Sequence, residues 1–61
     1  MYNKFVELLK GKGVTVYQVS KDTGISNSTL SDWKAGRSEP KLDKLKKLAD
    51  YFGVEVTYFL E

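Results

Sequence analysis

The sequence contains no cysteine and no histidine among its 61 residues. Without cysteine there is neither a disulfide framework nor a thiolate zinc site, and without histidine the commonest general base and metal ligand are missing. No apolar run approaches the roughly 20 residues that span a bilayer, and the N-terminus lacks the apolar core of a signal peptide. These absences predict a cytoplasmic protein with no cofactor, no metal, no membrane partner and no evident small-molecule ligand.

The short length also argues against catalysis. Sixty-one residues fit one small domain, which we expect to span residues 1–61. The carboxylates are scattered, the serines have no histidine or lysine partner at a defined spacing, and no glycine-rich loop is suited to cradle a phosphate. We therefore expect a protein that is not an enzyme.

The net charge of +2 is small, but the positive charge is concentrated in one part of the chain. Residues 34–47 carry six basic and two acidic side chains, a net charge of +4, whereas residues 48–61 carry a net charge of −3. Such a segment suits an anionic partner, and it also suits a helix face that is merely solvated. Charge alone leaves both interpretations open.

Glycine and hydroxyl residues mark the ends of helices. Glycine closes helices in the left-handed conformation, and it follows a helical pattern at Gly11, Gly24, Gly36 and Gly53. Thr15 and Gln18 fit a capping box, in which Thr15 bonds forward and Gln18 reaches back, and Ser26 is a second N-cap. These signals predict helices over 16–23 and 27–35.

Apolar periodicity predicts the remaining helices. One stripe comprises Tyr2, Phe5, Leu8 and Leu9, and another comprises Leu42, Leu45, Leu48, Ala49 and Phe52. A short fifth turn contains Phe59 and Leu60. A membrane-surface helix is the rival interpretation of residues 41–52, but so small a domain needs this stripe for its core. We expect an all-α, compact five-helix domain.

The predicted helix 27–35 has two unlike faces. At about 100° per residue, Leu30 and Trp33 point inward. The outward face carries Asn27, Ser28, Ser31, Asp32 and Ala35, with no lysine or glutamate. Solvated faces usually carry long charged side chains, so short ones favour the close approach of a partner. With helix 16–23 and a short glycine-containing turn, this is the order of a helix-turn-helix, whose second helix enters the major groove.

The chain from Thr15 to Leu60 resembles the DNA-binding domain of the phage-repressor family, the lambda-repressor-like or Cro/Xre-type helix-turn-helix proteins. The most specific shared residues are Gly24, Ile25, Ser26, Leu30, Trp33, Gly36, Pro40 and the ending "KLADYFGVEVTYFL". The resemblance implies a lambda-repressor-like fold with the helix-turn-helix in its second and third helices. It also implies sequence-specific binding to a double-stranded DNA operator, by a transcriptional regulator of the repressor type that pairs as a homodimer on DNA.

The family's contact positions fall on named residues of this sequence. The resemblance implies base contacts from Asn27, Ser28, Asp32, Ser31 and Thr29, and phosphate contacts from Thr15, Tyr17, Ser26, Arg37, Ser38 and Lys41. Asparagine can bond adenine at two atoms, and aspartate can accept from cytosine. Alternatives stay open, since Asn27 and Ser28 could supplement the cap, Asp32 could accept from Ser28, and Tyr17 could simply pack.

One position departs from the family, and one rival function remains. Many members have glutamine where this chain has Val16, so a phosphate contact there would come from backbone N–H groups or the Tyr17 hydroxyl. The rival function is a small helical module that binds a protein, such as a toxin or an anti-repressor. Only DNA binding predicts a steep dependence on salt. Both a DNA-binding fragment and a minimal protein that pairs only on DNA fit the sequence.

Overall fold

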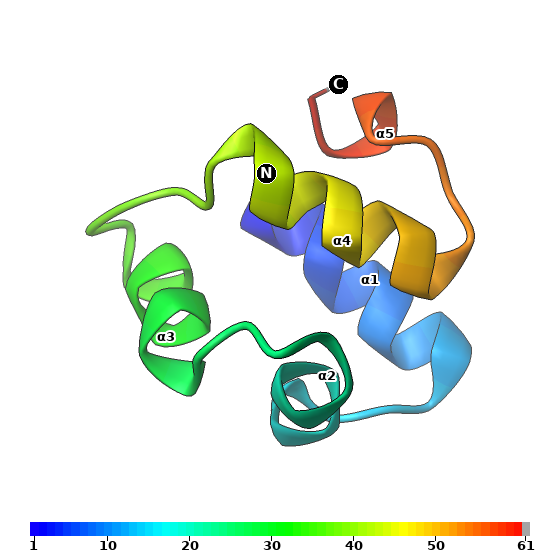
Figure 1. The fold of residues 1–61 in the computed structure, drawn as a ribbon, viewed down its shortest axis with the longest axis horizontal. Helices are drawn as coiled ribbons and strands as arrows, with labels where there is room; N and C mark the ends of the chain where they lie inside the picture. Colours follow the sequence, from blue (N-terminus) through cyan, green and yellow to red (C-terminus); the bar gives the residue numbers. More distant parts are fainter. Residues whose placement is uncertain (61) are drawn as a thin grey trace.

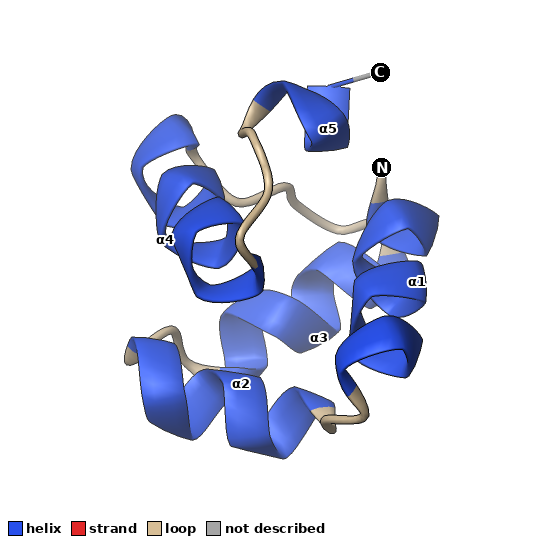
Figure 2. Cartoon of the chain, turned by 90° about the vertical axis from the view of Figure 1, so that its right-hand side faces the viewer, coloured by secondary structure: helices blue, strands red, loops and turns tan. Residues whose placement is uncertain are grey.

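The computed structural model describes residues 1–60, which form five helices (Figure 1). They are α1 (Tyr2–Lys12), α2 (Val16–Thr23), α3 (Asn27–Ala35), α4 (Leu42–Phe52) and α5 (Thr57–Leu60). Residues 1–60 contain no strand (Figure 2), so the predicted all-α, five-helix architecture is confirmed. Within the same residues, no helix has the length and apolar character needed to cross a membrane.

Both ends of α2 and α3 lie where the capping residues predict. The Thr15 hydroxyl accepts from the Gln18 N–H at 3.1 Å, and the Ser26 hydroxyl accepts from the Thr29 N–H at 3.2 Å. Gly24 and Gly36 follow the two helices in the left-handed conformation, with φ of 79° and 76°. Local hydrogen bonds and glycine chemistry therefore fix the bounds of both helices.

The prediction that Gly11 closes the first helix is wrong. The helix continues through Gly11 to Lys12, and Gly13 adopts the left-handed conformation instead, with φ of 72°. The N–H groups of Gly13 and Val14 both donate to the Leu9 carbonyl, at 2.8 and 3.1 Å. Either glycine could close the helix, but closure at Gly13 lets Val14 pack against the core.

The reciprocal half of the predicted capping box is also wrong. The Gln18 side chain does not turn back to Thr15, because its Nε2 donates to Asp22 Oδ1 at 2.9 Å, one turn further along α2. A carboxylate is a charged acceptor, and a hydrogen bond to a charged acceptor is stronger than one between neutral groups, which favours Asp22 as the partner of Gln18. Thr15 therefore caps α2 through the Gln18 backbone N–H, without a return bond from the Gln18 side chain.

Side chains from all five helices meet in one core. The buried apolar residues are Phe5, Val19, Ile25, Leu30, Trp33, Leu45, Leu48, Ala49 and Phe59. Figure 2 shows α1 and α4 on opposite sides of the domain, with α2 at one end and α5 at the other, and Figure 1 shows α3 beside α2. Leu42, expected in an apolar stripe, is instead 53% exposed, and Leu60, expected in the apolar fifth turn, is 57% exposed, because each lies at the end of its helix. The core thus positions the α2–α3 pair on the rest of the domain.

Candidate functional site

Hydroxyl groups hold the turn between α2 and α3. Ser20 Oγ donates to the Ile25 carbonyl at 2.6 Å, and Thr23 Oγ1 donates to the Val19 carbonyl at 2.7 Å. The Ile25 N–H in turn donates to Thr23 Oγ1 at 3.3 Å. Both polar groups of the Ile25 backbone are therefore satisfied while its side chain is buried. The roles of Ser20 and Thr23 were not predicted from the sequence, although hydroxyl residues in the last turn of a helix commonly bond the backbone.

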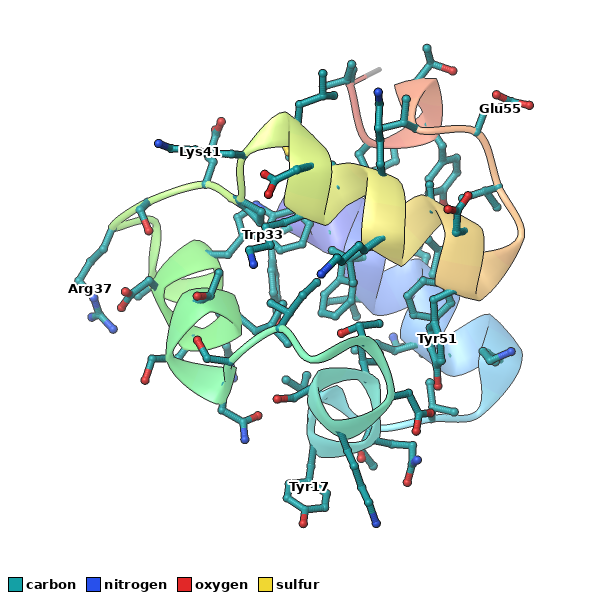
Figure 3. All side chains as sticks on the ribbon, viewed as in Figure 1. Tyr17, Trp33, Arg37, Lys41, Tyr51 and Glu55 are labelled. Atoms are coloured by element: carbon teal, nitrogen blue, oxygen red, sulfur yellow. The ribbon has the colours of Figure 1, made fainter. Side chains whose placement is uncertain are left out.

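A cluster of aromatic rings holds α3 from its inner face. Trp33 is 4% exposed, and its ring lies 5.3 Å from Tyr2, 5.2 Å from Phe5 and 6.1 Å from Phe59, measured between centroids. Figure 3 shows Trp33 inside the domain, between α3 and the rest of the molecule. Leu30, one turn earlier, is 1% exposed. The predicted core role of Trp33 is confirmed, and it fixes which face of α3 points outward.

The outward face of α3 consists of short polar side chains. Asn27, Ser28 and Ser31 are exposed, as expected for residues that face a partner. Thr29 is half-buried, and its hydroxyl lies 2.8 Å from the hydroxyl of Ser26, which also caps the helix. The structure therefore leaves Asn27, Ser28 and Ser31 accessible and ties Thr29 and Ser26 to each other at the helix start.

Asp32 has a partner that was not predicted from the sequence, the guanidinium of Arg37. Its Oδ1 accepts from Arg37 Nε at 2.9 Å, so the carboxylate faces Arg37 rather than Ser28. The Asp32 carbonyl also accepts from the N–H groups of Arg37 and Ser38, at 2.9 and 3.4 Å. Side chain and backbone of Asp32 together hold the start of the loop that leaves α3.

The residues assigned to phosphates are exposed at two places. Thr15 and Tyr17 lie at the start of α2, and Arg37, Ser38 and Lys41 lie in the segment between α3 and α4. Tyr17 is 66% exposed, which contradicts the alternative that it simply packs. Figure 3 shows Tyr17, Arg37 and Lys41 pointing away from the protein. These side chains therefore flank α3 without being committed to the core.

A second polar cluster joins α2 to α4. The Tyr51 hydroxyl donates to Asp22 Oδ2 at 2.6 Å, and Gln18 donates to the other carboxylate oxygen. The bond from Tyr51, followed by that from Gln18, lowers the pKa of Asp22, and the bond to Asp22 raises the pKa of Tyr51. Lys12 Nζ lies 5.1 Å from the centre of the Tyr51 ring, which brings the end of α1 to the same place. This cluster links the helix-turn-helix to the supporting helices.

Comparisons with known proteins agree with this geometry. The family model described as "Helix-turn-helix" matches residues 6–59. The chain is similar to the HTH-type transcriptional activator BcrR of Enterococcus faecalis, with 28% identity over 57 residues. The aligned region covers 93% of this chain, which spans 28% of the length of that relative. No solved structure matches the chain significantly.

Proposed function

Because the chain belongs to the helix-turn-helix family, we propose that it binds double-stranded DNA in a sequence-specific manner as a transcriptional regulator, with α3 in the major groove. The observation that carries the proposal is the contrast between the two faces of α3. Leu30 and Trp33 are buried on one face, while Asn27, Ser28 and Ser31 are exposed on the other. A rigid helix with short polar side chains outward is suited to approach base edges closely.

We propose that some of the exposed side chains contact base edges and that others contact phosphates. Asn27 can bond adenine at two atoms, and the hydroxyls of Ser28 and Ser31 can donate or accept at a base edge. Thr15, Tyr17, Ser38 and Lys41 lie beside the helix rather than on its outward face, so we assign them to phosphates. Thr29 and Ser26 bond each other, and we assign them to the helix start, where backbone N–H groups also attract a phosphate.

We propose repression as the direction of regulation. A domain bound over a promoter excludes the polymerase without needing any further contact, whereas activation requires a second favourable surface. The name of the relative from Enterococcus faecalis says that it is an activator. A reporter gene with the binding site inside its promoter tests the proposal, because repression predicts falling output as the protein is expressed, and rising output would contradict it.

Pairing on DNA is the remaining part of the proposal. We propose that two copies bind an inverted repeat, with half-site centres about one helical turn, roughly 10 base pairs, apart. Selection of bound sequences from random duplexes measures this spacing directly. A selected site with no inverted repeat would contradict pairing.

Salt dependence tests DNA binding itself. If Lys and Arg side chains replace counterions on phosphates, the logarithm of the binding constant falls linearly with the logarithm of the salt concentration. Titration of a selected duplex at several salt concentrations measures the slope, and a scrambled duplex of the same length is the control. Binding that is absent, or independent of salt and sequence, would favour a module that binds a protein instead.

A further inference from the structure

We propose that Asp32 is a positioning residue, which holds the guanidinium of Arg37 through Nε so that its remaining donors face the DNA. This inference rests on the proposed function and deepens it. In this proposal Arg37 contacts the DNA, either at a phosphate or at a base edge that carries hydrogen-bond acceptors. Asp32 does not contact the DNA and acts only through Arg37. The ligand chemistry is a pair of neighbouring acceptor oxygens or nitrogens, as found on a phosphate or on the guanine edge.

The geometry of the pair is set by the end of α3. Gly36 closes the helix in the left-handed conformation, and its N–H donates to the Trp33 carbonyl at 3.1 Å. Arg37 follows at once, and its own N–H donates to the Asp32 carbonyl at 2.9 Å. The Arg37 side chain therefore starts from a fixed point beside Asp32. Its Nε then reaches Asp32 Oδ1 at 2.9 Å.

This bond leaves most of the guanidinium available. An arginine side chain has five N–H donors in a rigid plane, and the contact with Asp32 uses the one on Nε. The Arg37 side chain is 66% exposed although it is paired, and Figure 3 shows it outside α3. The two terminal amino groups can thus meet an incoming acceptor while Nε stays bound.

The pair of Asp32 and Arg37 adds little to the stability of the fold. The side chains are 66% and 41% exposed, and ion pairs at that exposure contribute little to folding. The pair can contribute more to the affinity for DNA. A free arginine side chain loses rotamer freedom when it contacts DNA, and one that is already held loses less. Pairing also neutralises a carboxylate on α3 that would otherwise repel phosphates.

A double-mutant cycle tests the proposal with Asp32→Ala, Arg37→Ala and the double variant, titrated on the selected and the scrambled duplex. We expect Arg37→Ala to weaken binding of the selected duplex about tenfold in the wild-type background, and less than about threefold after Asp32→Ala. Losses on both duplexes would identify a phosphate as the acceptor, and a loss on the selected duplex alone would identify guanine. Asp50→Ala is the matched control, because it removes an exposed carboxylate from α4 and should leave the full effect of Arg37→Ala.

Two other results would overturn the inference. If Asp32 reads cytosine directly, Asp32→Ala changes the preferred base at one position, and Arg37→Ala keeps its full effect in both backgrounds. If Asp32 only repels DNA, Asp32→Ala strengthens binding to both duplexes, again without coupling to Arg37. Thermal melts of all variants ensure that folded protein is compared. In either case the wild-type chain still binds DNA with a salt-dependent slope, whereas failure of the proposed function would remove that binding altogether.

Discussion

The hydroxyl of Tyr51 on α4 donates to the carboxylate of Asp22 on α2 at 2.6 Å, which joins two helices across 29 positions of the sequence. The bond fixes the end of α2 to the supporting part of the domain. The turn between α2 and α3 is held by the bond from Ser20 to the Ile25 carbonyl. The bond between Tyr51 and Asp22 therefore also restrains the position of α3, whose outward face we propose to meet DNA. The bond is strongest while Asp22 is ionised and Tyr51 is protonated.

Tyr51→Phe should therefore lower the melting temperature near neutral pH and flatten its dependence on pH. The lowered pKa of Asp22 means that its contribution is present above the ordinary aspartate pKa of about 4 and is lost as the pH falls through the lowered value. The raised pKa of Tyr51 means that its contribution is present below about pH 10 and is lost as the pH rises through the raised value. Melts from pH 2 to 11 measure both limits. Tyr17→Phe, which removes a hydroxyl from a side chain that is 66% exposed, is the control and should not change the profile.

Gly11→Ala and Gly13→Ala should have opposite effects on stability. Gly11 is inside α1, and a Cβ there would have no neighbouring atom within 4 Å, so alanine should stabilise the helix by about 0.5–1 kcal/mol. Gly13 has φ of 72°, which alanine adopts with strain, so that change should destabilise by about 1 kcal/mol or more. Urea titrations give both values. Destabilisation by Gly11→Ala together with tolerance at Gly13 would mean that the helix ends at Gly11 after all.

Trp33→Ala should unfold the domain or nearly so. Truncation of a buried aromatic typically costs about 3–5 kcal/mol, and a domain of this size has little more stability than that. Trp33 also contacts the rings of Tyr2, Phe5 and Phe59, so its loss affects α1 and α5 together. Circular dichroism of the variant at 25 °C measures the effect, with Trp33→Phe as the milder comparison. A melt that shifts by only a few degrees would show that the tryptophan does not anchor α3.

Ser20→Ala should weaken both the fold and DNA binding. The variant leaves the part-buried Ile25 carbonyl without its Ser20 donor, which typically costs about 1–3 kcal/mol. The turn then holds α3 less rigidly against α2, so affinity for the selected duplex should fall further than the melt alone explains. Ser38→Ala, at an exposed serine, is the comparison for stability. Equal melting temperatures for the two variants would mean that the Ser20 bond contributes nothing.

Local signals explain why α2 and α3 could be predicted to the residue. A hydroxyl N-cap, a left-handed glycine and the inward spacing of Leu30 and Trp33 each act over a few residues, so the sequence contains all that they need. The closing residue of α1 could not be predicted, since the choice between Gly11 and Gly13 depends on where Val14 packs.

Two side-chain contacts near the candidate site could not be predicted, because they depend on tertiary structure. The polar face of α3 was predicted because its residue types are unusual for a solvated helix. The bond between Tyr51 and Asp22 depends on how α4 packs against α2. Helix periodicity relates only residues a few positions apart, whereas these two residues are 29 positions apart. The Arg37 partner of Asp32 depends on the path of the chain after Gly36, where the sequence pattern is no longer helical.

Asn27 and Lys41 should affect DNA binding in different ways, because we place one at base edges and the other at the backbone. Asn27→Ala should cost about 1–3 kcal/mol on the selected duplex and little on a scrambled one. Lys41→Ala should weaken binding to both duplexes equally, since a phosphate looks the same beside every base pair. It should also reduce the salt slope by about one, whereas Asn27→Ala should leave the slope unchanged.

Titrations of both variants on both duplexes at several salt concentrations separate these effects. Lys46→Ala is the matched control for Lys41→Ala, because it removes the same charge from an exposed position within α4, away from the α3–α4 segment. Its effect on the slope should be smaller, since a charge must lie close to a phosphate to displace a counterion. If Asn27→Ala lowers both affinities equally and Lys41→Ala changes neither affinity nor slope, α3 is not the reading helix. The exposed polar face of α3 would then be better explained as a surface for a protein partner.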